Sequence, residues 1–174
     1  MYAIGTPVLY GRTGVCRIED IGPAPFQEHD EQRYYKLRAV FSTSGECIYI
    51  PVDTAMPMRP LIGGGEAAGY MEQLPHLKPQ PINSQKPEEL AAHYHEVLVP
   101  GDPESLLLLI KEIYLKEKEL AAHRKKLGQV DSRYLRVAER LVCEEFAVAL
   151  QTTPESIKRR LYRRINATEA EAAG

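Results

Sequence analysis

The first part of the chain alternates between apolar and polar residues in short runs, which is the pattern of half-buried β-strands. Tight turns separate the runs, marked by glycine, which adopts a positive φ without steric cost. No segment with helical spacing interrupts them. The runs lie at 8–10, 15–21, 33–41 and 47–52. Residues 1–58 are therefore expected to form a small β-barrel of four or five short strands.

Pro51 lies within the last of these predicted strands. Proline has no backbone N–H and cannot donate to a neighbouring strand on that side. The strand at 47–52 is therefore expected to have a free edge at Pro51.

Beyond this region the apolar residues recur every three or four positions, as in amphipathic helices. Prolines and the triple glycine at 63–65 precede the change, so residues 59–65 are expected to form a linker between two domains. Asp102 followed by Pro103 is a strong helix start, because the aspartate caps the first turn and proline suits its first position. The predicted helices cover 66–74, 87–98, 103–126, 132–150 and, from a capping box at 152–155, about ten further residues to 165.

The predicted fold class is therefore α+β, with an N-terminal small β-barrel followed by an all-α domain over 66–166. The last residues, 167–174, are small or acidic and are expected to form a disordered tail.

Composition narrows the classes of protein further. The chain has 174 residues, of which 44% are hydrophobic and 26% charged, as in a folded globular protein. No apolar run approaches the ~18 residues of a membrane span, and the N-terminus lacks the pattern of a signal peptide. Cys16, Cys47 and Cys143 are too far apart for a zinc site or a disulfide framework. A cytoplasmic, monomeric protein with reduced thiols and no membrane association is expected.

No motif in the sequence indicates catalysis. The triple glycine at 63–65 lacks the Gly-Lys-Ser/Thr of a phosphate-binding loop. His93 and His95 are two positions apart on a predicted helix, so they point in nearly opposite directions and cannot share a metal ion. No nucleophile motif or pair of carboxylates stands out. We therefore expect no enzyme activity, no catalytic residue, no metal and no cofactor.

Charge is unevenly distributed along the chain. The formal net charge is −2, yet residues 111–164 carry 14 Lys and Arg against 8 Asp and Glu, whereas residues 61–110 are acidic. A basic region on a chain that is acidic overall is typical of a weak, partner-assisted contact with nucleic acid. Spacings of three and four place Arg133, Arg136 and Arg140 on one helical face. The other interpretation of these residues is a solvated helix face.

The first 60 residues also resemble a known module. Ile4-Gly5, Val8, Tyr10, Gly14-Val15, Ile18 and Ile21, followed by Tyr34-Tyr35-x-Leu37 and Ile48-Tyr49-Ile50-Pro51-Val52, resemble the N-terminal domain of the CarD family of bacterial transcription regulators. The same module occurs in transcription-repair coupling factors. The run from Arg133 to Glu144 loosely resembles the helical domain of that family, and Arg133 matches a basic position there.

The resemblance implies a non-enzymatic regulator that binds the β subunit of bacterial RNA polymerase. A Tudor-like barrel would lay an edge strand against that subunit, and the helical domain would contact promoter DNA. The implied polymerase-binding residues are Cys47, Tyr49, Ile50 and Pro51. The candidate DNA-binding residues are Arg124, Lys125, Arg133, Arg136 and Arg140.

Two departures from the family pattern bear on these expectations. The family inserts a tryptophan into the DNA minor groove, whereas this chain has no tryptophan and its corresponding stretch, 87–92, begins with two carboxylates after Pro87. Phosphates repel such carboxylates. The family also often has a basic residue two positions before the strand proline, where this chain has Tyr49.

Two other functions stay open at this point. Residues 146–165 resemble a helix-turn-helix, which would read DNA bases through its second helix. The alternative interpretation is purely structural: this helix closes the bundle, with Ile157, Leu161 and Ile165 packed inward. A protein adaptor without DNA contact is the third reading, suggested by the acidic region 61–110.

Overall fold

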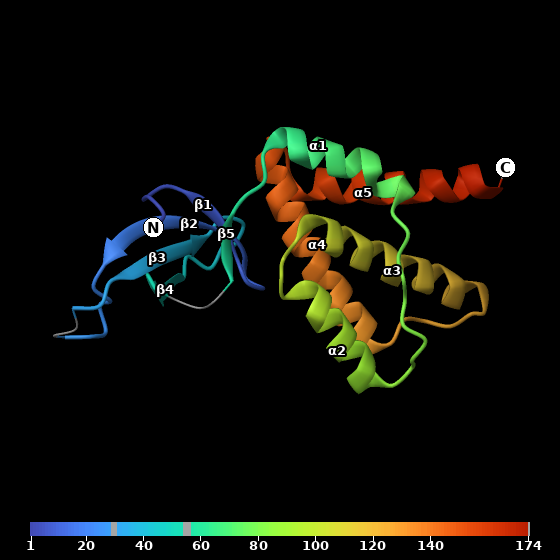
Figure 1. Cartoon of the computed structure of the whole chain (residues 1–174), viewed down its shortest axis with the longest axis horizontal. Helices are drawn as coiled ribbons and strands as arrows, with labels where there is room; N and C mark the ends of the chain where they lie inside the picture. The colour runs from blue at the N-terminus through green and yellow to red at the C-terminus, as the bar shows by residue number, and fades with distance from the viewer. Residues whose placement is uncertain (29–30, 54–56, 174) are drawn as a thin grey trace. The chain divides into compact units, whose positions relative to one another are not determined.

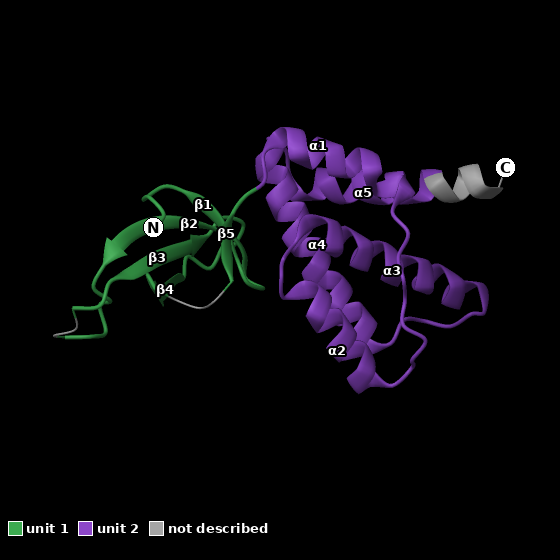
Figure 2. Cartoon of the chain, viewed as in Figure 1, with its two compact units in different colours: residues 1–61 green, residues 62–174 purple. Residues whose placement is uncertain are grey.

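The computed structural model describes residues 1–28, 31–53 and 57–173, with side chains described as far as Ala167. The chain forms two compact units, residues 1–61 and residues 62–174 (Figure 2). The first unit holds the strands and the second holds the helices (Figure 1). The predicted α+β class is confirmed.

The first unit is one antiparallel sheet of five strands in the order β4-β3-β2-β1-β5. Strands β1 to β4 pair in the order of the sequence, and β5 returns to pair with β1. The strands are β1 (Pro7–Tyr10), β2 (Gly14–Gly22), β3 (Tyr34–Ala39), β4 (Cys47–Pro51) and β5 (Met58–Pro60).

The prediction of a barrel is wrong, because the sheet is open. Closing a sheet requires its two edge strands to pair with each other. Here β4 pairs with β3 and β5 pairs with β1, and no pairing joins β4 to β5 in the described part of the chain. Strand β5 also occupies two positions of the expected linker, 59–60. The Tudor-like character of the unit stays an expectation.

One face of the sheet carries the core of this unit. Alternate residues of four strands meet there, as the two-residue period predicts. Ile48 and Val52 pack against this core from the edge. The core residues are Val8, Tyr10, Cys16, Ile18, Tyr35, Leu37 and Ile50.

The described residues of the second unit form five helices and one short 3-10 turn. The helical spacing of apolar residues predicts a core stripe of Leu106, Leu109, Ile110, Ile113 and Leu120 on the third helix; the first four are buried and Leu120 is half-buried. The elements are α1 (Gly64–Gln73), η1 (Leu74–His76), α2 (Pro87–Leu98), α3 (Pro103–Ala122), α4 (Gln129–Ala149) and α5 (Pro154–Ala173). None of the helices in the described residues is both long enough and apolar enough to cross a membrane.

Helix ends differ from the prediction in four helices, one of which is α4, which begins at Gln129 instead of about 132. α1 begins at Gly64, inside the expected linker. α3 ends at Ala122 rather than near 126, because Arg124 has a φ of 59° and the N–H of Lys125 donates to the Leu120 carbonyl, which is a Schellman-type stop. α5 extends to Ala173, and the tail expected over 167–174 falls almost entirely outside the described side chains.

Buried polar groups tie α1 and the segment after it to the rest of the second unit. The fully buried Glu145 carboxylate accepts a hydrogen bond from the Ile62 N–H at 3.0 Å. Lys111 Nζ is buried and donates to three carbonyls, those of Leu74, Pro75 and Leu77. These contacts hold a segment that has little regular structure of its own.

Candidate functional site

The outer edge of β4 displays unpaired backbone groups. The Val52 N–H donates to the Arg33 carbonyl at 3.0 Å, which fixes the phase of hydrogen bonding between β3 and β4. Because donors and acceptors alternate along a strand, the backbone groups of Ile48 and Ile50 also face β3. Those of Cys47, Tyr49 and Pro51 therefore face away from the sheet.

This phase explains why proline is accepted at position 51. Its missing N–H would point outward, so no ladder hydrogen bond is lost. The predicted free edge is confirmed, since β4 pairs with only one other described strand. Two N–H donors, at Cys47 and Tyr49, and three carbonyl acceptors line the edge.

The side chains of β4 divide between the two faces of the sheet. Ile50 is 5% exposed and belongs to the core, so neither its side chain nor its backbone groups reach the edge. We had expected Ile50 to contact a partner, but its side chain instead packs in the core and supports strand β4. Tyr49 and Pro51 lie on the opposite face and are half-buried.

An aromatic cluster of Phe26, Tyr34 and Tyr49 lies on that opposite face, beside the β4 edge. Phe26 contacts both tyrosine rings edge to face, with centroid distances of 5.7 Å to Tyr49 and 6.2 Å to Tyr34. The Tyr34 hydroxyl donates to Gln27 Oε1 at 2.5 Å, which fixes the loop that carries Phe26. Phe26 itself is 65% exposed, so the cluster presents an apolar surface to solvent.

Phe26 was missed by the sequence interpretation. It follows the Pro-Ala-Pro segment at 23–25, and these prolines indicate only a break after the second predicted strand. Nothing in that local pattern indicates that the loop returns over β3 and β4. A large aromatic residue in an otherwise polar turn is the one signal that was available.

Next to the aromatic cluster lies a charged cluster of Glu19, Lys36 and Arg38. A β-bulge in β2 between Ile18 and Asp20 places Glu19 as an extra residue against β3. Its carboxylate forms ion pairs with Arg38 and, at 3.5 Å, with Lys36. The Arg38 hydrogen bond, aided by both positive charges, lowers the pKa of Glu19, and Glu19 in turn raises the pKa of Arg38.

Four of the candidate DNA-binding residues lie near the corner between α3 and α4, and Arg140 lies further along α4. Arg124 and Lys125 lie in the turn after α3 and are exposed. Arg133, Arg136 and Arg140 are exposed along α4, at the spacing that the sequence predicts. The helical face expected from that spacing is thus confirmed as solvent-facing.

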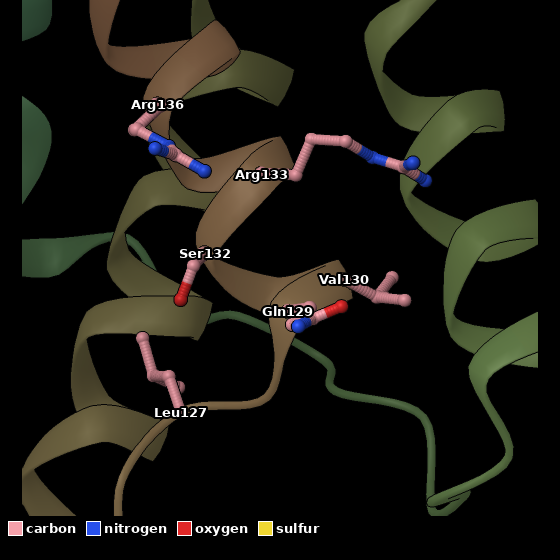
Figure 3. A pocket seen from close by; sticks show the side chains of 6 residues that line it. All are labelled: Leu127, Gln129, Val130, Ser132, Arg133 and Arg136. Carbon is pink, nitrogen blue, oxygen red and sulfur yellow. The ribbon is translucent and has the colours of Figure 1, made fainter.

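Only part of this set gathers at one place. Arg133 and Arg136 line a shallow pocket of about 430 Å³ on the first turns of α4, together with Leu127 and Gln129 (Figure 3). Figure 3 shows the Arg133 side chain extending away from Arg136, and its guanidinium lies 5.2 Å from the centroid of the Tyr134 ring. Arg140 lies further along α4, away from this pocket.

A second pocket, of about 540 Å³, opens where α2, α3 and α4 meet. Lys125 lines it together with Lys116 and Lys126, and its apolar wall includes Leu90. The buried Asp131 carboxylate accepts from the Tyr94 hydroxyl at 2.6 Å and pairs with Lys116 at 3.0 Å. Burial and this hydrogen bond raise the pKa of Tyr94.

The start of α2 is the position where the family resemblance implies a tryptophan. Pro87 lines the second pocket, and Glu88 and Glu89 are exposed in the first turn of the helix. These carboxylates stabilise the helix start. They do not form a cationic surface, so any DNA contact here depends on the lysines across the pocket.

No grouping of three His, Cys, Asp or Glu side chains suited to a metal ion occurs among the described residues.

Helices α4 and α5 flank a short turn, and Ile157, Leu161 and Ile165 on α5 are fully buried. The inward packing expected of a bundle-closing helix is therefore confirmed.

Comparison with protein-family models identifies the N-terminal part of the chain. Residues 2–62 match the CarD-like/TRCF RID domain family, and this range covers the first unit except Met1, together with the first residue of the second. A search of the curated proteins found no match to the chain. The matched domain type is an RNA polymerase-interacting domain, consistent with a role in transcription.

Proposed function

Because residues 2–62 form a CarD-like/TRCF RID domain, we propose that this chain is a non-enzymatic transcription regulator that binds the β subunit of bacterial RNA polymerase. Binding would occur by strand addition, in which an extended segment of the polymerase pairs with β4. The proposal places the protein in the cytoplasm, as a monomer without a cofactor.

The outward backbone groups of β4 are the observation that carries this proposal. Cys47 and Tyr49 present N–H and carbonyl groups on the free edge, and Pro51 adds a carbonyl. An added strand would satisfy these groups with main-chain hydrogen bonds whatever the partner's sequence. Proline at position 51 limits the added pairing to the first part of the edge and helps to prevent edge-to-edge aggregation.

Side chains beside the edge would provide specificity. A partner strand continues the sheet, so its alternate side chains lie over the face that holds Tyr49 and Phe26. The charges nearest to them, on Glu19, Lys36 and Arg38, already pair with one another. We therefore infer that apolar contact replaces the ion pair that a basic residue at position 49 would make.

The test is binding of the full chain to the isolated β-subunit lobe of its host polymerase, using Cys47→Pro and Cys47→Ala. Both variants lose the thiol, but only the proline variant loses the outward N–H. We expect the alanine variant to bind like the wild type and the proline variant to bind about tenfold more weakly. Equal affinity of the two variants, with unfolding curves showing that both are folded, would contradict strand addition.

We further propose that the α3–α4 corner contacts promoter DNA within the polymerase complex. The exposed residues Arg124, Lys125, Arg133, Arg136 and Arg140 support this. Each phosphate contact that is removed should reduce the slope of log K against log salt by about 0.9. The double variant Arg133→Gln/Arg136→Gln should lose up to about two units of slope, whereas Arg17→Gln/Arg33→Gln, at exposed positions of the first unit, should lose none.

The exposed Glu88 and Glu89 favour a second candidate, an adaptor that binds polymerase without touching DNA. The same salt titration separates the two functions. An adaptor gives a promoter-complex affinity that is unchanged by Arg133→Gln/Arg136→Gln, together with intact binding to the β lobe.

A further inference from the structure

Helix α5 concentrates positive charge more densely than any of the sequence-predicted sites. Five of the seven residues from 158 to 164 are Lys or Arg, on a chain whose formal net charge is −2. The buried residues Ile157, Leu161 and Ile165 hold the opposite side of this helix against the bundle. The basic side chains therefore cannot turn inward and must lie at the surface or at its margin.

Two of the five basic residues have structural partners. Lys158 pairs with the Glu139 carboxylate at 3.2 Å. Arg164 donates to the carbonyls of Met71 and Glu72, at 3.1 and 2.9 Å, and so caps the end of α1. Their charges are accounted for by the packing of α5 against its neighbours.

The other three, Arg159, Arg160 and Arg163, are exposed. None of them forms an ion pair or a hydrogen bond with another side chain in the described part of the chain. Arg163 is three and four positions after the other two, so the guanidinium groups share one side of the helix. Like charges at these spacings destabilise a helix, so packing within the molecule does not explain them.

We propose that this face of α5, formed by Arg159, Arg160 and Arg163, binds the phosphate backbone of duplex DNA without reading its sequence. Guanidinium groups match phosphate oxygens with paired hydrogen bonds. Arg159 and Arg163 are about 6 Å apart along the helix axis. Duplex DNA carries one phosphate per roughly 1.7 Å of its axis, so a patch of this length can reach two or three phosphates.

The contact is separate from the one proposed at the α3–α4 corner. Figure 1 shows α4 running from the end of the unit that holds α2 to the end where α1 and α5 lie. Lys158 pairs with Glu139, which lies between Arg136 and Arg140 on α4, so the basic stretch of α5 lies beside the middle of α4. The two contacts are distinct because Arg159, Arg160 and Arg163 belong to α5, and the α5 surface does not depend on the function proposed for the first unit.

The start of α5 argues against base reading. A recognition helix contacts base edges with its N-terminal residues. The first turn of α5 begins with Pro154 and carries the exposed carboxylate of Glu155. The arginines lie one to two turns further on, where a helix that follows the DNA surface meets phosphates instead of bases.

The experiment is a salt titration of full-chain binding to two short duplexes of unrelated sequence, measured by fluorescence anisotropy. The test variant is Arg159→Gln/Arg160→Gln/Arg163→Gln. The matched control, Arg17→Gln/Arg33→Gln/Lys78→Gln, removes the same charge from exposed positions elsewhere. We expect the test variant to lose about two to three units of salt slope for both duplexes, and the control to lose less than one.

Three results would overturn the proposal. One is a test variant whose slope equals that of the wild type or of the control. Another is a wild-type preference of more than about tenfold for one duplex that disappears in the test variant, which would indicate base reading by a helix-turn-helix. The third is an unchanged DNA slope with weakened binding to the β lobe, which would assign the arginines to an acidic protein surface.

Two measurements keep these outcomes interpretable. Unchanged helical circular dichroism shows that the test variant is folded, as expected for three exposed side chains. Unchanged binding of the test variant to the β lobe separates this contact from the polymerase contact. Arg159→Lys/Arg160→Lys/Arg163→Lys should retain the salt slope because it retains the charges.

Discussion

Single residues on β4 have opposite tasks although they are neighbours in the sequence. Ile50 supports the sheet from the core, whereas Tyr49 and Pro51 lie on the opposite face, where we propose that a partner binds. The sequence pattern identified this strand and its free edge, because proline and two-residue alternation have local physical causes. It could not separate Ile50 from the contact residues, since that depends on which side of the sheet the core occupies.

The first prediction concerns Ile50 and Tyr49. Ile50→Ala should lower the free energy of unfolding by about 2–4 kcal/mol, because it leaves a cavity in the core. Tyr49→Ala should cost about 1 kcal/mol or less, since it removes only a half-buried aromatic contact. Urea unfolding measures both. Equal losses would show that Tyr49 is part of the core and not of a contact surface.

The second prediction concerns Glu19. Its pKa lies below the ordinary value of 4.5, so its ion pairs add stability at neutral pH that is lost as the pH falls through the folded pKa. Glu19→Gln should therefore lower the free energy of unfolding at neutral pH. The variant should also lose less of that free energy than the wild type when the pH is lowered. Glu46→Gln, at an exposed position next to β4, is the control. If the free energy of unfolding of Glu19→Gln falls with decreasing pH as steeply as that of the wild type, the ion-pair assignment is contradicted.

At the scale of elements, helix existence was easier to predict than helix ends. The five helices follow from spacing and start signals such as Asp102, whose side chain accepts from the Ser105 N–H. The stop of α3 was placed too late, because it depends on a left-handed residue at Arg124 instead of at the nearby Gly128. Strand β5 was missed because three residues beside prolines carry no visible period.

The third prediction concerns the junction of α1 with α4. A Cβ atom added at Gly64 would lie 2.9 Å from the Ala149 carbonyl oxygen, which is backbone and cannot move aside. Gly64→Ala should therefore destabilise the protein by about 1–3 kcal/mol. Gly65→Ala meets nothing within 4 Å and should be neutral or slightly stabilising. Thermal unfolding of the pair tests the contact, and equal melting temperatures would show that α1 does not pack this closely.

At the scale of the whole molecule, the two units have different proposed functions, polymerase binding for the first and DNA contact for the second. The first presents a strand edge and the second presents cationic surfaces, on a chain whose formal net charge is −2. Charge segregation along the sequence indicated the basic half, but not which of its side chains have partners within the fold. Glu139 pairs with Lys158 and the carbonyls of α1 accept from Arg164, so the basic residues that remain available to a partner are decided by contacts that exist only after folding.

Hydrogen exchange at β4 is the most direct test of the central claim, that the polymerase β lobe adds a strand to this edge. In the free protein, the amides of Ile48 and Ile50 should exchange slowly and those of Cys47 and Tyr49 quickly, because only the first pair faces β3. Addition of the β lobe should slow Cys47 and Tyr49 by at least about tenfold. Saturated binding that leaves these two amides fast would contradict strand addition at β4.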